Sequence, residues 1–148
     1  MNAVVTFTVD GILCGLSVTV VREVLPMVAL RPLPRQTPPL IGLLTLRGEL
    51  IPVVALRSWL GREEQTPNSL TRIIIAEGRD GRIGLVVDEV HDVVQTEGWH
   101  PSPLPPDRFG GPSAYLSGLL GRDGVTISLL DLSSLLALSE ATGRELTS

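Results

Sequence analysis

The feature that most constrains how this chain can fold is an internal repeat. Residues 15–25 resemble residues 84–94, at a separation of 69 residues (84 − 15), and both segments open with Gly-Leu-x-Val. The same separation aligns Pro32-Leu33-Pro34 with Pro101-Ser102-Pro103. A fixed separation of this kind indicates that one structural unit occurs twice.

A second separation extends the repeat. It is 76 residues (118 − 42) and aligns Gly42-Leu43-Leu44 with Gly118-Leu119-Leu120, and residues 53–56 with residues 129–132. The change from 69 to 76 predicts an insertion in the Pro/Gly-rich loop of the second copy. Chance similarity of two β-rich segments is the alternative, but matched blocks in one order favour duplication. Because neither half is long enough to be stable alone, we expect two small barrels that share an apolar layer.

The pattern within these blocks is that of short β-strands. Residues 5–9 alternate apolar and polar side chains, the period of a half-buried strand, and Asp10-Gly11 is typical of a hairpin turn. Further β-branched runs predict strands at 18–24, 50–54, 72–76, 83–87 and 125–130. Helical spacing is limited to short stretches at Leu56 and Leu132, the second preceded by Asp131 as an N-cap. The sequence therefore predicts an all-β fold with short helices.

Residues that could support catalysis or metal binding are few. The histidines are His91 and His100, the one cysteine is Cys14, and their spacing suits no zinc site. We interpret both histidines as surface residues and the adjacent acids Asp88-Glu89 as solvated surface. The sequence contains no nucleophile elbow, phosphate-binding glycine loop or dinucleotide fingerprint. We therefore expect no enzymatic activity, no cofactor and no metal.

Composition restricts the partners. The net charge is −4 and aromatic residues make up 3% of the chain, so neither a basic face nor a stacking platform for nucleic acid is expected. The single cysteine fits a reducing compartment. The N-terminus lacks the basic region of a signal peptide, and the apolar stretch 11–21 is too short to span a bilayer. We expect a cytoplasmic protein without direct membrane insertion, whose apolar surface binds other proteins.

Several segments resemble one known family. Residues 42–57, GLLTLRGELIPVVALR, look like the signature G-x-x-N-L-R-G-x-x-x-P-V-x-D-L-R of the chemotaxis coupling-protein (CheW-like) family. Val21-Arg22-Glu23-Val24 is similar to its V-x-E-V/I segment, and Pro32-Leu33-Pro34 to its proline-marked connection. In the second half, residues 84–90 resemble its G-x-x-V-D-x-V, and Tyr115-Leu116-Ser117-Gly118 its Y-x-x-G. The resemblance extends over nearly the whole chain, from about residue 4 to residue 138.

The resemblance implies two pseudo-symmetric five-stranded SH3-like β-barrels that share a core. We expect a single domain over residues 1–148, with approximate subdomains at 15–70 and 71–135 that the terminal segments complete. The resemblance also implies a non-catalytic adaptor that links the cytoplasmic domain of methyl-accepting chemoreceptors to the regulatory domain of a CheA-type histidine kinase. The receptor's helical hairpin is expected in an apolar groove between the barrels, and the kinase at exposed edge and loop residues.

The residues expected to bind receptor or kinase lie in the matched segments. They are Val21, Glu23, Gly42, Thr45, Arg47 and Gly48. Arg47 offers a planar fork for a carboxylate or carbonyl, and the two glycines allow close backbone approach or a turn with positive φ. The alternatives are a solvated turn residue for Arg47, a solvated strand residue for Glu23, and burial in the core for Val21.

Two positions depart from the family signature. Thr45 stands where the family has Asn and Ala55 where it has Asp, although the second-copy counterpart Asp131 is kept. Ala55 cannot cap the turn that starts at Leu56, and loss of such a cap costs about 1 kcal/mol. Kinase binding is therefore the role most in question, and an accessory adaptor that binds the receptor without coupling the kinase is the alternative. Two further alternatives are a small β-barrel module that binds a ligand or nucleic acid, and an enzyme. The sequence lacks the basic stripe or exposed aromatics expected of the first and the catalytic motifs expected of the second.

Overall fold

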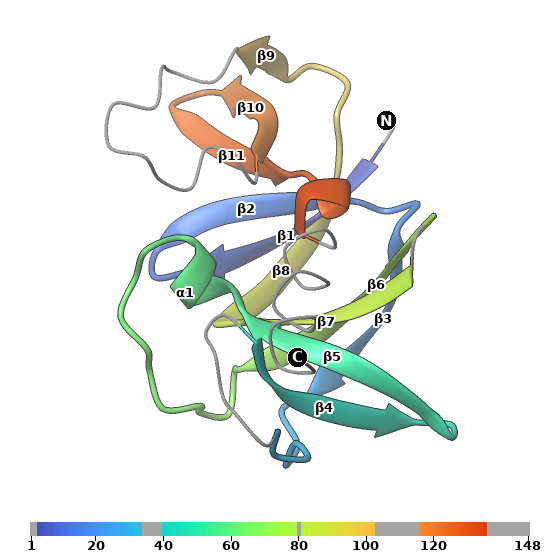
Figure 1. Ribbon diagram of the computed structural model, residues 1–148. Helices are drawn as coiled ribbons and strands as arrows, with labels where there is room; N and C mark the ends of the chain where they lie inside the picture. Colours follow the sequence, from blue (N-terminus) through green and yellow to red (C-terminus); the bar gives the residue numbers. More distant parts are fainter. Residues whose placement is uncertain (1–2, 34–39, 80, 103–115, 136–148) are drawn as a thin grey trace.

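The structure is a computed structural model that describes residues 3–33, 40–79, 81–102 and 116–135 (Figure 1). Most of these residues lie in short strands, one short helix follows the fifth strand, and residues 132–135 are also helical. The elements are β1 (Ala3–Val9), β2 (Ile12–Ser17), β3 (Val21–Pro26), β4 (Leu40–Leu46), β5 (Glu49–Ala55), α1 (Leu56–Trp59), β6 (Arg72–Gly78), β7 (Gly81–Val87), β8 (Glu89–Gln95), β9 (His100–Ser102), β10 (Leu116–Arg122) and β11 (Val125–Leu130).

The strands form two sheets. The first sheet has five strands in the order β3-β6-β7-β5-β4, and the second has six in the order β8-β1-β2-β11-β10-β9. This arrangement confirms the predicted all-β fold with short helices. The second sheet has six strands where five were expected, because the three-residue β9 pairs with the edge of β10.

The sheets divide the chain differently from the subdomains expected at 15–70 and 71–135. Residues 72–87, which form β6 and β7, complete the first sheet. The N-terminal hairpin β1–β2 lies inside the second sheet, because β1 pairs with β8 and β2 pairs with β11. The first sheet is therefore one continuous segment, whereas the second is built from both ends of the chain.

Strand pairing repeats with the separations found in the sequence. In the first sheet β5 runs parallel to β7, with Val53 opposite Gly84. In the second sheet β11 runs parallel to β2, with Leu129 opposite Gly15. A register shift near the start of β4 also recurs near the start of β10. The two sheets are thus copies of one unit.

Each sheet has a small apolar core of its own, and a larger core joins the two. The first sheet's own core is Leu44, Ile51, Val53, Ile73 and Ile75, and the second sheet's is Val4, Leu120 and Ile127. The larger cluster, here called the shared core, includes Phe7 from β1, Leu16 from β2 and Ile74 from β6. Successive side chains of a strand point to opposite faces, so β6 contributes to two cores at once.

Two-residue turns close three of the hairpins. Asp10-Gly11, Arg47-Gly48 and Asp123-Gly124 each have positive φ at both residues. That pattern defines a type I′ turn, whose twist matches that of the flanking strands. The predicted turn at Asp10-Gly11 is confirmed.

The two short helices begin differently. At the start of α1, Ala55 makes no side-chain capping hydrogen bond. At the start of the 132–135 helix, Asp131 Oδ1 accepts a hydrogen bond from the Ser133 N–H at 3.1 Å, and its Oδ2 accepts one from the Ser134 hydroxyl at 3.0 Å. The predicted N-cap is therefore present in the second copy and absent from the first.

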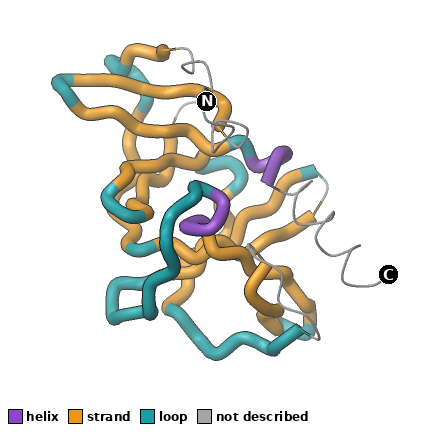
Figure 2. Tube along the Cα trace, turned by 60° about the vertical axis from the view of Figure 1, so that its left-hand side comes forward, coloured by secondary structure: helices purple, strands orange, loops and turns teal. Residues whose placement is uncertain are grey.

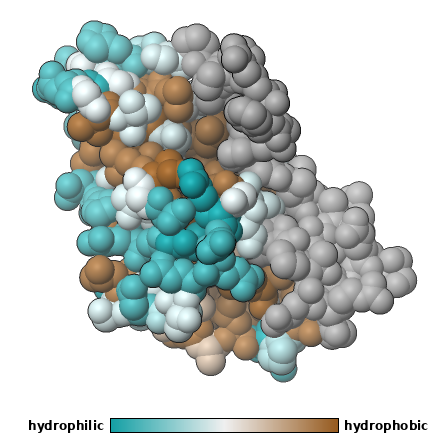
Figure 3. All heavy atoms as spheres, turned by 90° about the vertical axis from the view of Figure 1, so that its left-hand side faces the viewer, coloured by the Kyte–Doolittle hydropathy of each residue, from teal (hydrophilic) through white to brown (hydrophobic). Residues whose placement is uncertain are grey.

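The loop that follows α1, residues 61–71, runs over the surface beside the strands (Figure 2). Residues 61–70 are exposed and Thr71 is buried. On the face that carries α1 and this loop, Figure 3 shows hydrophilic surface at the centre with hydrophobic surface above and below it.

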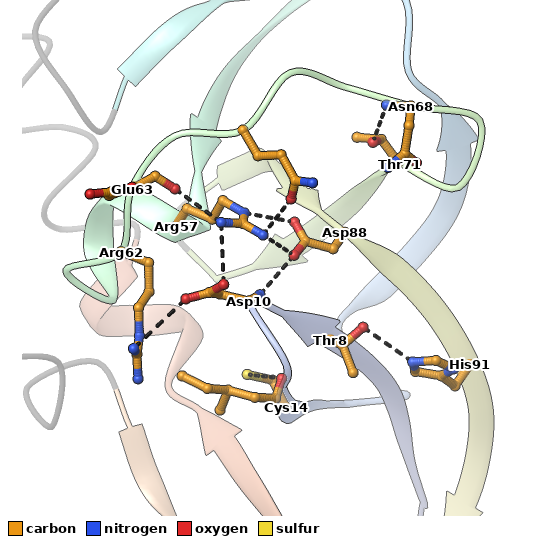
Figure 4. Close-up of polar contacts among 12 residues, drawn as sticks. Thr8, Asp10, Cys14, Arg57, Arg62, Glu63, Asn68, Thr71, Asp88 and His91 are labelled. Carbon is orange, nitrogen blue, oxygen red and sulfur yellow. Dashed lines mark hydrogen bonds and ion pairs between the residues drawn. The ribbon is translucent and has the colours of Figure 1, made fainter.

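Arg57 holds this loop and both sheets together (Figure 4). Its Nε donates to Asp88 Oδ1 at 3.0 Å and its Nη2 to Asp88 Oδ2 at 2.6 Å. Two further N–H groups reach the Glu63 carbonyl and the Gln65 side-chain oxygen in the loop. Its Nη1 also lies 3.5 Å from Asp10 Oδ1 in the β1–β2 turn. One guanidinium thus ties the second sheet's hairpin to the first sheet's loop.

The interpretation of Asp88 as solvated surface was wrong. Its side chain is 29% exposed and pairs with Arg57, whose side chain is 15% exposed. Burial favours the protonated form of Asp88. The hydrogen bonds from Arg57 and from the Asp10 N–H outweigh this effect, so the pKa of Asp88 lies below its ordinary value.

We expect Asp131→Ala to lower the free energy of unfolding by about 1 kcal/mol, because two capping hydrogen bonds are lost. Urea denaturation monitored by circular dichroism would measure the difference. Ser133→Ala, which keeps the cap, is the matched control and should be nearly neutral. An Asp131→Ala variant as stable as the wild type would contradict a stabilising cap.

We expect Arg57→Met to cost roughly 2 kcal/mol at pH 7, because Asp88 loses the charged donor that offsets its burial. The folded pKa of Asp88 is depressed, so its stabilising contribution is present above the unfolded pKa and is lost as the pH falls through the folded value. The difference in the free energy of unfolding between wild type and variant should therefore become smaller below about pH 4. Arg62→Met, at a more exposed arginine, should cost less than about 0.5 kcal/mol. A gap that does not change with pH would contradict this account.

Candidate partner-binding surface

Arg47 and Glu23 form a two-pronged ion pair at the surface. Arg47 Nη1 lies 2.7 Å from Glu23 Oε2, and Nη2 lies 3.2 Å from Oε1. The Arg47 side chain is 71% exposed and that of Glu23 is 28% exposed. The hydrogen bond from Arg47 holds the pKa of Glu23 below its ordinary value. Neither residue is simply solvated, and two of the six expected site residues are brought into direct contact.

The pair forms because the first sheet curls back on itself. Glu23 lies on β3 and Arg47 in the β4–β5 turn, and β3 and β4 are the two edge strands of that sheet. Residues after β3 close the gap, since Arg31 bridges to Leu43 in β4 through two backbone hydrogen bonds. Closure requires Gly42, because a Cβ there would lie 2.8 Å from Leu30 Cβ and 3.0 Å from the Arg31 carbonyl oxygen.

The remaining expected residues have distinct environments. Gly48 completes the turn beside Arg47 with a φ of 81°, which favours glycine. Thr45 is exposed on β4, opposite Leu50 of β5. Val21 is half-buried and packs against the shared core. Glu23, Arg47 and Gly48 are therefore adjacent, whereas Val21 contributes mainly to packing.

A row of alternating charges lies beside this pair. Glu77 on β6 accepts hydrogen bonds from Arg22 on β3, at 2.7 Å, and from Arg82 on β7, at 2.8 Å. Arg82 also donates to Glu49 on β5 at 2.9 Å. These two arginines hold the pKa of Glu77 below its ordinary value. Sequence reasoning missed this row, because each partner lies on a different strand and only the sheet order places them side by side.

The described cysteine and histidines are not part of such charge networks. Among the described residues, no group of histidine, cysteine or acidic side chains could hold a metal ion. Burial raises the pKa of the Cys14 thiol to about 12. His91 and His100 are exposed, and His91 Nε2 lies 3.2 Å from the Thr8 hydroxyl. Within the same part of the chain, no helix is long and apolar enough to cross a membrane.

Comparisons with known proteins agree with this architecture. A family model described as the CheW-like domain matches residues 3–140. The chemotaxis protein CheW of Thermotoga maritima is 32% identical over 145 residues, which covers 96% of this chain and 91% of the relative. The chemotaxis protein CheW of Rhizobium meliloti is 27% identical over 124 residues, covering 84% and 80%.

A solved structure extends the likeness from sequence to fold. The crystal structure of the scaffolding protein TtCheW from Thermoanaerobacter tengcongensis matches with a TM-score of 0.79 and 29% sequence identity, covering 88% of each chain. This match confirms the predicted pair of SH3-like barrels. With a family model that spans nearly all of its length, the chain belongs to the CheW-like domain family.

Proposed function

We propose that this chain couples the cytoplasmic domain of a methyl-accepting chemoreceptor to the regulatory domain of a CheA-type histidine kinase. As a CheW-like protein it is an adaptor of chemotaxis. The observation that carries the proposal is the exposed Arg47–Glu23 pair, which joins the two signature segments of the first half. In this proposal the adaptor acts in the cytoplasm, without catalysis, through surface contacts alone.

The geometry of the pair suits recognition of a partner. A guanidinium carries five N–H donors, and Glu23 engages two of those of Arg47. The others point to a partner's carboxylates or carbonyls, while Glu23 keeps the long side chain in one orientation and so lowers the entropy lost on binding. Leu50, which is 50% exposed on β5, supplies apolar contact area two residues after the Arg47-Gly48 turn.

We expect Arg47→Glu to weaken binding of at least one partner about tenfold, because it places a carboxylate beside Glu23 and removes the donor fork. The melting temperature should change little, since Arg47 is mostly exposed. Isothermal titration with each partner and a thermal melt would measure both effects. Arg122→Glu, the same charge reversal in the second sheet's exposed hairpin, is the control and should keep wild-type affinity. If Arg47→Glu unfolds the protein, Arg47 is a structural residue.

A charge swap separates direct contact from internal support. The double variant Glu23→Arg/Arg47→Glu keeps an ion pair between the two positions but reverses its direction. If Arg47 contacts the partner directly, the swap should bind as weakly as Arg47→Glu. Recovery of wild-type affinity would instead show that the pair only stabilises the barrel.

The accessory-adaptor alternative rests on the two departures from the family signature, Thr45 and Ala55, the second of which leaves the start of α1 without a side-chain cap. A titration of the chain with a chemoreceptor tip and, separately, with the kinase regulatory domain decides between the two adaptors. We expect binding to both. Binding to the receptor alone would make the protein an accessory adaptor, and binding to neither would refute the proposed coupling.

A further inference from the structure

A cavity of about 210 Å³ opens at one end of the first sheet, under loop 61–71. None of the six expected site residues lines it. Four half-buried side chains, here called the apolar wall, come from the strand ends: Met27, Ile41, Ala55 and Val86. A cavity of about 150 Å³ is enough to hold benzene, so this one accommodates a ring-sized apolar group.

The repeat provides an internal control for the apolar wall. The separations of 69 and 76 residues place Thr96, Ser117, Asp131 and Ser17 at the equivalent positions of the second sheet. The equivalence is structural as well, because Ile41 and Ser117 both occupy the register shift of their strand. All four counterparts are polar, so this fold does not require apolar residues at these positions. In the first sheet Met27, Ile41 and Val86 pack against that sheet's own core and also line the cavity, so only this sheet carries a cavity wall that is apolar.

The opposite wall of the cavity is held in place. It consists of loop residues 64–68. Arg57 fixes one end of this segment through the Glu63 carbonyl and the Gln65 side chain. Asn68 fixes the other end, since its N–H donates to the Thr71 hydroxyl at 2.9 Å and its side-chain oxygen accepts from the Leu70 N–H at 2.8 Å.

Charge at the cavity favours a cation. The charged residues that line it are Arg57, Asp88 and Glu64. Arg57 and Asp88 neutralise each other in the ion pair described above. Glu64 is exposed, and its carboxylate has no ion pair or hydrogen bond with another described residue. One negative charge is therefore left for a ligand.

We propose that this cavity binds a small organic cation whose hydrocarbon part rests on the apolar wall and whose ammonium group pairs with Glu64. Cavities at the mouths of β-barrels, mostly apolar with a few polar groups, are common small-molecule sites. Neither Arg47 nor Glu23 lines the cavity, so a ligand can bind there while a protein partner remains bound at the Arg47–Glu23 pair.

Benzylammonium is a suitable probe, because it joins a benzene ring to one positive charge. Titration of the isotopically labelled full chain, followed by amide NMR, should shift the signals of the apolar wall and of loop 61–71. Benzyl alcohol, the neutral analogue, should bind about threefold more weakly, the size expected for one exposed ion pair. No receptor or kinase is present, so the result is independent of the proposed coupling.

Four variants test the charged and the apolar half of the site. Glu64→Gln should weaken benzylammonium binding about threefold and leave benzyl alcohol binding unchanged. Glu63→Gln, one position earlier and outside the cavity lining, should change neither. Ile41→Ser, which installs the second sheet's residue, should weaken both ligands by tenfold or more. Ala55→Leu, which fills the cavity with apolar volume, should do the same and replaces Ile41→Ser if that variant is unfolded.

The proposal is wrong if benzylammonium shifts no signal at this site. It is also wrong if Glu64→Gln and Glu63→Gln behave alike, because the charge would then play no part. If the same residues respond only to the kinase regulatory domain or the receptor tip, the cavity is a protein-docking surface and the small-cation proposal fails.

Discussion

The structure depends on the apolar layer between the two sheets. Each sheet alone encloses only a small core, whereas the shared core draws side chains from β1, β2, β5, β6, β7 and the 132–135 helix. Such small barrels would bury too little apolar surface to be stable separately. A strand that packs against its own sheet's core on one face and against the shared core on the other must be apolar on both faces. This explains the uninterrupted apolar run Ile73-Ile74-Ile75-Ala76 of β6.

Surface features follow from how this layer fixes the sheets. Once β6 and β7 are held against the shared core, the curl of the first sheet brings β3 close to the β4–β5 turn, and Glu23 meets Arg47. The same curl leaves the other end of the sheet open beside α1, where Arg57 anchors loop 61–71. The Arg47–Glu23 pair and the cavity are thus separate features that both result from the curl of the first sheet.

The sequence predicted the architecture well, because a duplication can be recognised by comparing the sequence with itself, without knowing which residues are in contact. The separations between matched blocks agree with strand pairs such as Val53 with Gly84 and Leu129 with Gly15. The assignment of strands to sheets was less accessible. β1 and β2 are the counterparts of β6 and β7, but their position at the N-terminus does not reveal that they join strands from the far end of the chain.

Side-chain partners were the least predictable part of the site. The family signature predicted that Arg47 and Glu23 contact a partner, and the structure adds that they form an ion pair with each other. Asp88 was misjudged because its neighbour on the chain, Glu89, says nothing about Arg57, which lies on another element. Ion pairs between strands depend on strand register and on the curl of the sheet. Neither can be predicted from the spacing of residues within one segment.

The placement of the N-terminal hairpin has a consequence for biosynthesis. A ribosome releases β1 and β2 first, yet their neighbours β8 and β11 are among the last strands to emerge. The first sheet can assemble as soon as β7 has left the ribosome. At that point β1 and β2, which carry Phe7 and Leu16, still lack their neighbouring strands β8 and β11. Pairings between distant segments form slowly, and unpaired strand edges invite aggregation in the interval. The nascent chain is therefore most vulnerable between the release of β7 and that of β11.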